Sequence, residues 1–173
     1  MKYVRANRLG RVRWGVLDGD VIRTLKWPPY DGAEYYDGKA WKVADCQLLA
    51  PCDPGKIVCV GKNYYDHAVE MGEGIPDRPI LFMKTHNCIN DPEGEIHAPD
   101  FVQRLDYEGE LAFVVKKTAS RVKAAEAWEY ILGFTILNDV TARDVQKADG
   151  QWARGKSFDT FAPLGPHLET EFD

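Results

Sequence analysis

The chain lacks several features that would indicate particular classes of protein. Its 173 residues contain no apolar run near the roughly 20 residues that cross a bilayer, and the start, MKYVRANRLGRVRWG, lacks a signal peptide's apolar segment. No Gly-x-Gly-x-x-Gly or phosphate loop follows any apparent strand, which argues against nucleotide binding. The net charge is −5 and basic residues are dispersed, so nucleic acid is not an expected partner. We expect a cytoplasmic protein that acts on neither membranes nor nucleic acid.

Cysteines are few and have no metal-binding spacing. The four cysteines form no Cys-x-x-Cys pair, which argues against structural zinc. Without an export signal, a disulfide is not expected either. Cys59 lies in an apolar run from Ile57 to Val60 and is interpreted as a small core residue. No catalytic role is assigned to any cysteine; the other three, Cys46, Cys52 and Cys88, are interpreted as either buried or free.

The length and the distribution of prolines predict two units. At about 100 to 200 residues per domain, the chain can form one sizeable core with a small appended unit. Pro51 and Pro54 interrupt both helix and central strand, so we place the boundary after residue 50. The predicted units are a small β-rich unit at residues 1–50 and a larger unit at residues 51–173.

Local patterns predict the elements within these units. Alternating apolar residues before and after Asp18-Gly19 indicate a β-hairpin, and the proline- and glycine-containing stretch at residues 27–41 predicts loops. Asp139 or Thr141 is the expected cap of a third helix. We predict strands at residues 56–60, 79–83, 110–115 and 133–138, and helices at residues 64–71, 123–130 and 142–148.

Three carboxylates outline a metal site. Glu108 and Glu110 are two residues apart on a predicted strand, so they share a face, while the flanking apolar residues would face a core. Asp139 follows another strand, and three carboxylates suit a hard cation such as Mg²⁺ or Mn²⁺ better than zinc or copper. The alternative is two acids alternating on a solvent-facing strand.

Five motifs, from about Lys56 to Pro166, occur in an order that resembles the fumarylacetoacetate hydrolase family. They are VGKNYYDHAVE, PILFMKT, LDYEGELAFVV, ILNDVTARDVQ and RGKSFDTFAPLGP. The resemblance implies a β-rich α+β fold, a mixed β-roll or β-sandwich of the fumarylacetoacetase C-terminal-domain type, with a small N-terminal β unit. Relatives continue beyond this region with further strands, so we expect an incomplete C-terminus; they also imply a homodimer.

The resemblance assigns roles residue by residue. It implies that Lys156 stabilises negative charge on the substrate, and that His67 and Glu70, on one helix face, form a water-activating base. The alternative for Lys156 is a surface lysine without a catalytic role. The alternatives for His67 are a structural histidine or, together with Glu70, a His-x-x-Glu pair of metal ligands. Asp106 is either a fourth acid near the ion or an acceptor behind it. The implied metal ligands are Glu108, Glu110 and Asp139, which bind Mg²⁺ or Mn²⁺, and the implied substrate-binding residues are Lys84, Arg143 and Gln146.

The implied reaction is metal-dependent cleavage of a carbon–carbon bond in a 2-oxo or 1,3-diketo acid, such as an acylpyruvate or fumarylpyruvate. Decarboxylation of oxo acids and isomerisation of 2-hydroxyhepta-2,4-diene-1,7-dioate use the same kind of site, and all three pass through an enolate. Having both His67 and Glu70 favours hydrolysis, and relatives of this kind imply a role in aromatic-compound breakdown. A hypothesis from another class is a metal-binding polypeptide without turnover.

Overall fold

A computed structural model describes residues 1–30, 32–70, 72, 74 and 76–172, apart from the side chains of residues 67, 68 and 70. None of the helices described is long and apolar enough for a membrane span. The strands are β1 (Lys2–Arg8), β2 (Arg11–Asp18), β3 (Val21–Leu25), β4 (Tyr36–Lys42), β5 (Gln47–Leu49), β6 (Ile57–Gly61), β7 (Ile80–Lys84), β8 (Ile89–Asn90), β9 (Leu105–Asp106), β10 (Gly109–Val115), β11 (Ile131–Asn138), β12 (Thr141–Ala142) and β13 (Ala162–Glu169). The helices are α1 (Tyr65–Glu70), α2 (Arg143–Asp149) and α3 (Trp152–Lys156), with 3₁₀ helices η1 (Val43–Asp45), η2 (His86–Cys88) and η3 (Ala124–Tyr130).

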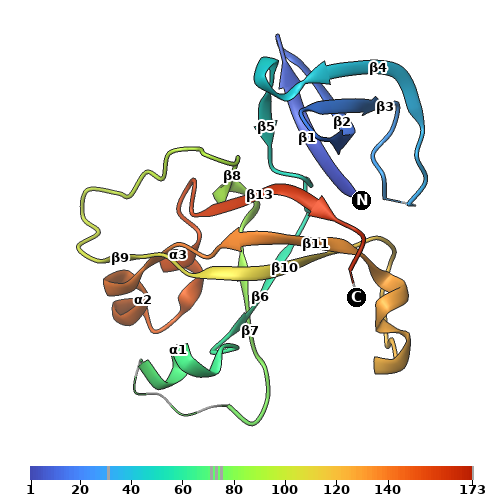
Figure 1. Cartoon of the computed structure of the whole chain (residues 1–173). Helices are drawn as coiled ribbons and strands as arrows, with labels where there is room; N and C mark the ends of the chain where they lie inside the picture. Colours follow the sequence, from blue (N-terminus) through green and yellow to red (C-terminus); the bar gives the residue numbers. More distant parts are fainter. Residues whose placement is uncertain (31, 71, 73, 75, 173) are drawn as a thin grey trace.

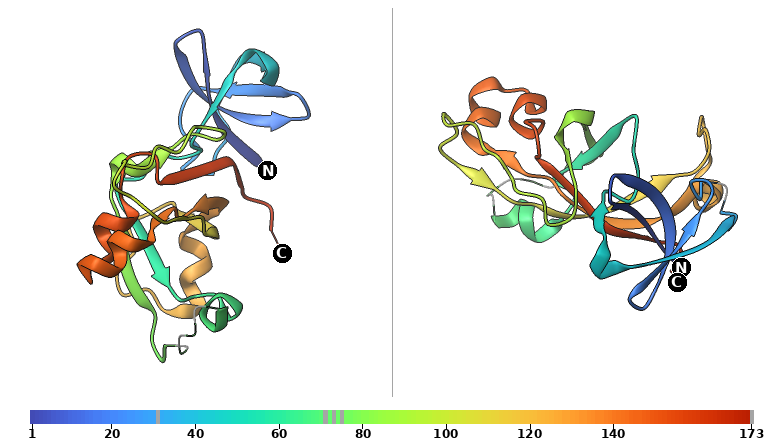
Figure 2. Two further views of the ribbon diagram at one scale, coloured as in Figure 1. Left: turned by 90° about the vertical axis from the view of Figure 1, so that its left-hand side faces the viewer. Right: turned by 90° about the horizontal axis from the view of Figure 1, so that it is seen from above.

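One large sheet connects both ends of the chain. Among the described residues it has nine strands, with a path β10-β11-β13-β1-β2-β3-β4, and β5 and β8 attached to β1 and β13. The antiparallel pairing of β1 with β13 joins the N-terminal strands to the rest (Figure 1). Two further ribbons pair β6 with β7 and β9 with β12. The fold is therefore the β-rich α+β type expected, with α2 and α3 far from the N-terminal strands (Figure 2).

The predicted N-terminal β-hairpin is confirmed. Strands β2 and β3 pair antiparallel from Gly15–Thr24 to Asp18–Val21, and Gly19 in the turn has a positive φ of 60° that suits glycine. The expectation of loops throughout residues 27–41 was wrong for its second half, where β4 pairs with β3. Pairing with β3 and burial of Trp41 stabilise this strand, despite the low strand propensity of the residues around Gly38.

The expected strands and helices of the larger unit are also present. Strands β6, β7, β10 and β11 lie where the sequence predicted them, and so do the three helical segments, although residues 124–130 form a 3₁₀ helix. The expected cap of α2 was wrong, because the N-cap is Ala142, with no side-chain hydrogen bond. Thr141 Oγ1 instead donates to the Asp139 carbonyl, at 2.9 Å. The side chain of Asp139 is also engaged elsewhere, as described below.

The two faces of β10 differ in a way that the sequence did not indicate. Glu110 faces inward together with Ala112 and Val114, as strand alternation requires. The expectation that the flanking apolar residues face a core was wrong, since Leu111 is 68% and Phe113 57% exposed. No described element packs closely enough on this side to bury them. The outer face defined by β10 and β11 comprises Leu111, Phe113, Val115, Phe134 and Ile136.

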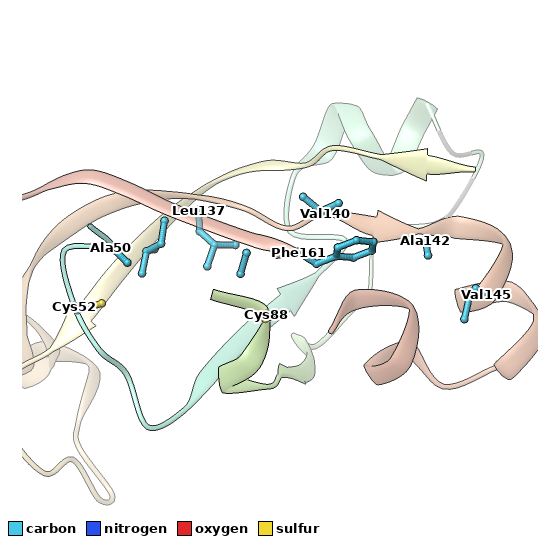
Figure 3. Close-up of a cluster of buried hydrophobic side chains, with 10 residues drawn as sticks. Ala50, Cys52, Cys88, Leu137, Val140, Ala142, Val145 and Phe161 are labelled. Atoms are coloured by element: carbon cyan, nitrogen blue, oxygen red, sulfur yellow. The ribbon is translucent and has the colours of Figure 1, made fainter. Parts of the chain in front are cut away.

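The principal core lies between the large sheet and the segments beside it. Figure 3 shows buried side chains from the connection after β5, from β11 and from α2 meeting around Phe161. Burying each large apolar side chain stabilises the fold by roughly 1.5–3 kcal/mol. This core fixes the ends of β11 and α2, which carry several of the candidate site residues. Its buried members are Ala50, Cys52, Cys88, Leu137, Val140, Ala142, Val145, Phe161, Ala162 and Leu164.

Candidate active site and metal centre

Pairing of β10 with β11 brings three carboxylates together. Gly109 pairs with Asn138, so the residues just before β10 and just after β11 are neighbours. Asp139 N donates to Glu108 O at 2.8 Å, and Glu108 N donates to the Asn138 side chain at 3.0 Å. Glu110 projects from the inward face of β10. Two acids close in sequence and one distant acid therefore meet at one end of the sheet.

Two buried lysines hold the carboxylate of Asp139, which has no exposed surface. Lys84 Nζ donates to Asp139 Oδ1 at 2.8 Å, to Val140 O at 3.4 Å and to Lys156 O. Lys156 Nζ donates to Asp139 Oδ2 and, at 2.8 Å, to Glu108 Oε2. Because one ammonium bridges Glu108 and Asp139, these two carboxylates converge on a common cation position.

Arg143 binds the other side of Glu108. Its Nη2 donates to Glu108 Oε1, its Nε to Asp106 Oδ2 at 2.9 Å and its Nη1 to Gln146 Oε1 at 2.8 Å. Asp106 also accepts from Arg104 at 3.1 Å. The structure thus places Asp106 behind the site, as a partner of two arginines. Asp144 accepts hydrogen bonds from the backbone N–H groups of residues 103 and 104.

The neighbouring charges affect Glu108 and Glu110 in opposite directions. Burial opposes ionisation of Glu108, but the charges and hydrogen bonds of Lys156 and Arg143 outweigh it and lower its pKa. Burial, reinforced by the charges of Asp139 and Glu108, raises the pKa of Glu110 to about 7. Among the described residues, no hydrogen bond engages the Glu110 side chain. Glu110 therefore sits close to negative charge that a bound cation would neutralise.

A cavity of about 270 Å³ opens above these groups. Trp152 of α3 forms one wall; its ring packs edge-on against Phe82 with centroids 5.3 Å apart. A Cβ at Gly61 would lie 2.4 Å from the Trp152 ring, so this wall requires glycine in β6. The other lining residues are Val60, Lys62, Asn63, Tyr64, Glu108, Glu110, Asp139, Arg143, Gln146, Lys147, Gly150 and Lys156.

The donor atoms fit a divalent cation. Oxygen atoms of Glu110 and Asp139 and the Cys59 sulfur lie within 4.8 Å of one another, a spread that a shared ion can close with small side-chain movements. Glu108 lies outside this group in the structure, but it shares the Lys156 ammonium with Asp139 and lines the same cavity. Three carboxylates in a partly buried cavity are a donor set for Mg²⁺ or Mn²⁺, with room for water and substrate oxygens.

The remaining predicted site residues differ in whether they line the cavity. Arg143, Gln146 and Lys156 line the cavity with the three acids. Lys84 is buried behind Asp139 and is not among the described cavity-lining residues. His67 and Glu70 belong to α1, but their side chains lie outside the described part of the structure.

Sequence reasoning did not assign Cys59 or Trp152 to the site. Cys59 was interpreted only as a core residue, and it is indeed buried. Inward alternation along β6 was the available signal, but only the tertiary structure shows that this face meets the acids. Trp152 offered no signal beyond its place next to the RGKSFD motif.

The chain belongs to the fumarylacetoacetate hydrolase family. Residues 56–173 match the family described as "Fumarylacetoacetate (FAA) hydrolase C-terminal". Residues 1–51 match a second description, "Rv2993c-like, N-terminal". The five motifs and the three converging carboxylates all lie in the region of the first match.

Similar proteins include enzymes with more than one reaction. Protein Rv2993c of Mycobacterium tuberculosis is 46% identical over 95% of this chain and 66% of its own length. A mitochondrial oxaloacetate tautomerase of Xenopus laevis is 44% identical over 74% of this chain and 41% of its own length. The crystal structure of 5-carboxymethyl-2-hydroxymuconate delta-isomerase from Mycobacterium smegmatis has a TM-score of 0.91 at 39% identity, over 100% of this chain and 68% of that one. The chain thus spans between about two fifths and two thirds of these relatives.

Proposed function

We propose that this protein is a divalent-metal-dependent enzyme that forms the enolate of a 2-oxo acid. The observation that carries the proposal is the convergence of Glu108, Glu110 and Asp139 at one cavity, next to Lys156. These carboxylates would hold Mg²⁺ or Mn²⁺. When bound, the ion would polarise a substrate carbonyl and stabilise negative charge on its oxygen.

Lys156 is the residue we propose to bind the substrate's carboxylate or developing oxyanion. Its ammonium lies 4.9 Å from the centroid of the Phe82 ring, on the side of the acids, and its side chain is almost fully buried. A cation held in place before the reaction stabilises developing charge without reorganisation. Its hydrogen bonds to Glu108 and Asp139 fix its position.

Arg143 and Gln146 are proposed to orient the substrate at the opposite wall. The guanidinium already bonds Gln146 Oε1, leaving the amide nitrogen of Gln146 as a donor for a substrate oxygen. Lys84 is proposed to act through Asp139, not by touching substrate, because its ammonium is enclosed by Asp139 and two carbonyl groups. The organisation into residues 1–50 and 51–173 remains a proposal that the two family matches support.

Hydrolysis of a carbon–carbon bond in an acylpyruvate or fumarylpyruvate is the reaction we propose first, with His67 and Glu70 as the base that activates water. A second candidate is isomerisation or tautomerisation, which moves a proton and needs no attacking water. The muconate isomerase and oxaloacetate tautomerase among the similar proteins favour this second candidate. Both reactions share the enolate and the same carboxylate site.

Turnover of the full chain tests these alternatives. Acetylpyruvate, fumarylpyruvate and oxaloacetate would be supplied with Mg²⁺ or Mn²⁺, beside the variants His67→Ala and Lys156→Met. Metal-dependent cleavage of the acylpyruvates that is lost in His67→Ala supports the hydrolase, whereas keto–enol exchange alone supports the tautomerase. Carbon dioxide release from oxaloacetate alone would make it a decarboxylase. Metal binding without any turnover would contradict the enzymatic proposal for this chain.

A further inference from the structure

A thiol lies directly beside the carboxylates. Strand alternation places Cys59 on the inward face of β6, opposite Phe82 of β7, and its side chain belongs to a residue that is only 5% exposed. Its Sγ lies within 4.8 Å of carboxylate oxygens from both Glu110 and Asp139. The thiol therefore lies beside two of the three proposed metal ligands, although Cys59 is not among the described cavity-lining residues.

The surroundings of Cys59 differ from those of the other cysteines. Cys88 Sγ donates to Thr85 O at 2.8 Å, Cys46 Sγ donates to Lys42 O at 3.3 Å, and Cys52 is a member of the principal hydrophobic core. No hydrogen bond is found for the Cys59 thiol within the described part of the chain. Among the described cysteines, Cys59 is therefore the one whose sulfur forms a group with two carboxylates at ligand-like distances.

Sulfur changes which ions the site can select. Three carboxylates favour hard cations, but a thiolate is a soft ligand that favours zinc-like ions. Zinc binds sulfur at about 2.3 Å and carboxylate oxygen at about 2.0–2.2 Å, so in a tetrahedral site these ligand atoms lie roughly 3.6 Å apart. The three donor atoms lie within 4.8 Å of one another, so binding would draw them up to about 1 Å closer together.

We propose that Cys59, Glu110 and Asp139 form a mixed sulfur–oxygen site for a thiophilic divalent cation of the zinc class. The inference rests on the carboxylate site of the proposed function and adds a sulfur ligand that the hard-metal form of the site does not use. When the metal–sulfur bond forms, the S–H bond breaks and the proton passes to solvent, with no change of oxidation state. Thiophilic ions would thus compete with Mg²⁺ or Mn²⁺ for this position.

The test uses Cd²⁺ as the probe, because a cadmium–thiolate bond absorbs in the ultraviolet and a cadmium–carboxylate bond does not. The full chain would be titrated with Cd²⁺ by calorimetry and absorption, and separately with Mn²⁺. The variants are Cys59→Ser and Cys59→Ala, and the matched control is Cys52→Ser, since Cys52 is equally buried at 5% exposure but outside the site. Thermal unfolding of each variant verifies that it folds.

We expect the thiolate absorption band at one Cd²⁺ per chain, with release of about one proton. Both Cys59 variants should lose the band and at least about tenfold in Cd²⁺ affinity, while Mn²⁺ affinity changes by no more than about twofold. Cys52→Ser should keep the band. If one Cys59 variant unfolds, the other gives the same comparison.

Two outcomes would overturn the inference. Cd²⁺ binding without the band, or a band that survives in the Cys59 variants, would show that the thiol is not a ligand, even if Mn²⁺ still binds and the proposed function stands. Binding of neither ion would overturn both proposals. A Cys59-dependent band in a chain that does not bind Mn²⁺ would support the mixed site and contradict the proposed hard-metal enzyme.

Discussion

Both regions of this chain bury apolar side chains, but among the described residues only residues 51–173 also bury charged ones. In residues 1–50 the sheet encloses apolar groups, with Val4 and Ile22 fully buried. In residues 51–173 the best buried groups include the charges of Lys84 and Asp139, while apolar side chains such as Leu111 lie outside. The same strand alternation operates in both regions. The comparison teaches that alternation sorts residues onto two faces, whereas the neighbouring elements decide which face is buried.

The largest expected effect is the loss of folding stability when a buried charge loses its partner. Lys84→Met leaves Asp139 Oδ1 without its ammonium partner at a carboxylate with no exposed surface, and breaking such a buried pair costs about 3–5 kcal/mol. Urea unfolding should show this loss of stability. Lys117→Met is the control, because its pair with Glu129 is exposed and should be worth less than about 1 kcal/mol. Equal losses in both variants would mean that the buried pair has no special role.

A smaller effect on folding stability is expected when the same substitution is made in each of the two regions. Ile22→Val removes one methylene from a site with no exposure and should cost about 0.5–1.5 kcal/mol. Ile136→Val changes the outer face of β11, where the residue is 59% exposed, and should cost less than about 0.5 kcal/mol. Chemical denaturation of both variants measures the difference. A large loss for Ile136→Val would show that the outer face is covered in solution.

Substitutions on the outer face should affect dye binding and self-association more than the free energy of unfolding. Phe113→Ser should lower the free energy of unfolding by no more than about 1 kcal/mol, because the edge-on contact with Phe134 and the strand propensity of phenylalanine are lost. It should nevertheless reduce binding of an apolar dye and self-association, because contiguous exposed apolar side chains promote both. Dye fluorescence and light scattering provide the readout, and Tyr107→Ser is the control, an exposed aromatic that precedes β10. Identical dye binding in unaltered and Phe113→Ser protein would contradict the assignment.

The smallest expected effect is a pH dependence in the N-terminal region. Partial burial opposes ionisation of Asp37, but hydrogen bonds from Thr24 Oγ1 and Lys39 N outweigh it and lower its pKa. This contribution to stability is present above the ordinary pKa of 3.8 and is lost as the pH falls through the lower folded value. Asp37→Asn should therefore destabilise the protein slightly at neutral pH and make Tm fall less steeply in acid. Parallel Tm curves for the two proteins would refute this.

Sequence patterns selected the three acids as candidates because Glu110 lies on a strand with regular alternation and Glu108 and Asp139 lie next to strand ends. Glu108 and Glu110 are two residues apart, and Asp139 follows a clearly apolar strand. The same reasoning failed for Leu111 and Phe113, because the sequence does not say what covers the other face of β10. It also could not connect Cys59 with Glu110, since their proximity depends on how the β6–β7 ribbon lies against β10.

In some elements, local residue propensities disfavour the secondary structure that forms. Pro163 and Pro166 both lie within β13, which pairs with β1, β8 and β11. Proline lacks an N–H donor, so local propensity disfavours this strand, and its three partners supply the pairing. The family motif RGKSFDTFAPLGP therefore did not indicate this strand.

The most direct test of the account is the binding of Mn²⁺ to the full chain, measured by electron paramagnetic resonance, for the unaltered protein, Glu110→Gln and the exposed control Glu95→Gln. Glu110 is the candidate ligand whose carboxylate makes no hydrogen bond within the described part of the chain, so its amide variant removes a metal ligand with little disturbance. We predict one Mn²⁺ per chain, at least about a tenfold loss of affinity in Glu110→Gln and no change in Glu95→Gln. Equal Mn²⁺ binding by all three proteins, or none by the unaltered protein, would contradict the carboxylate metal site.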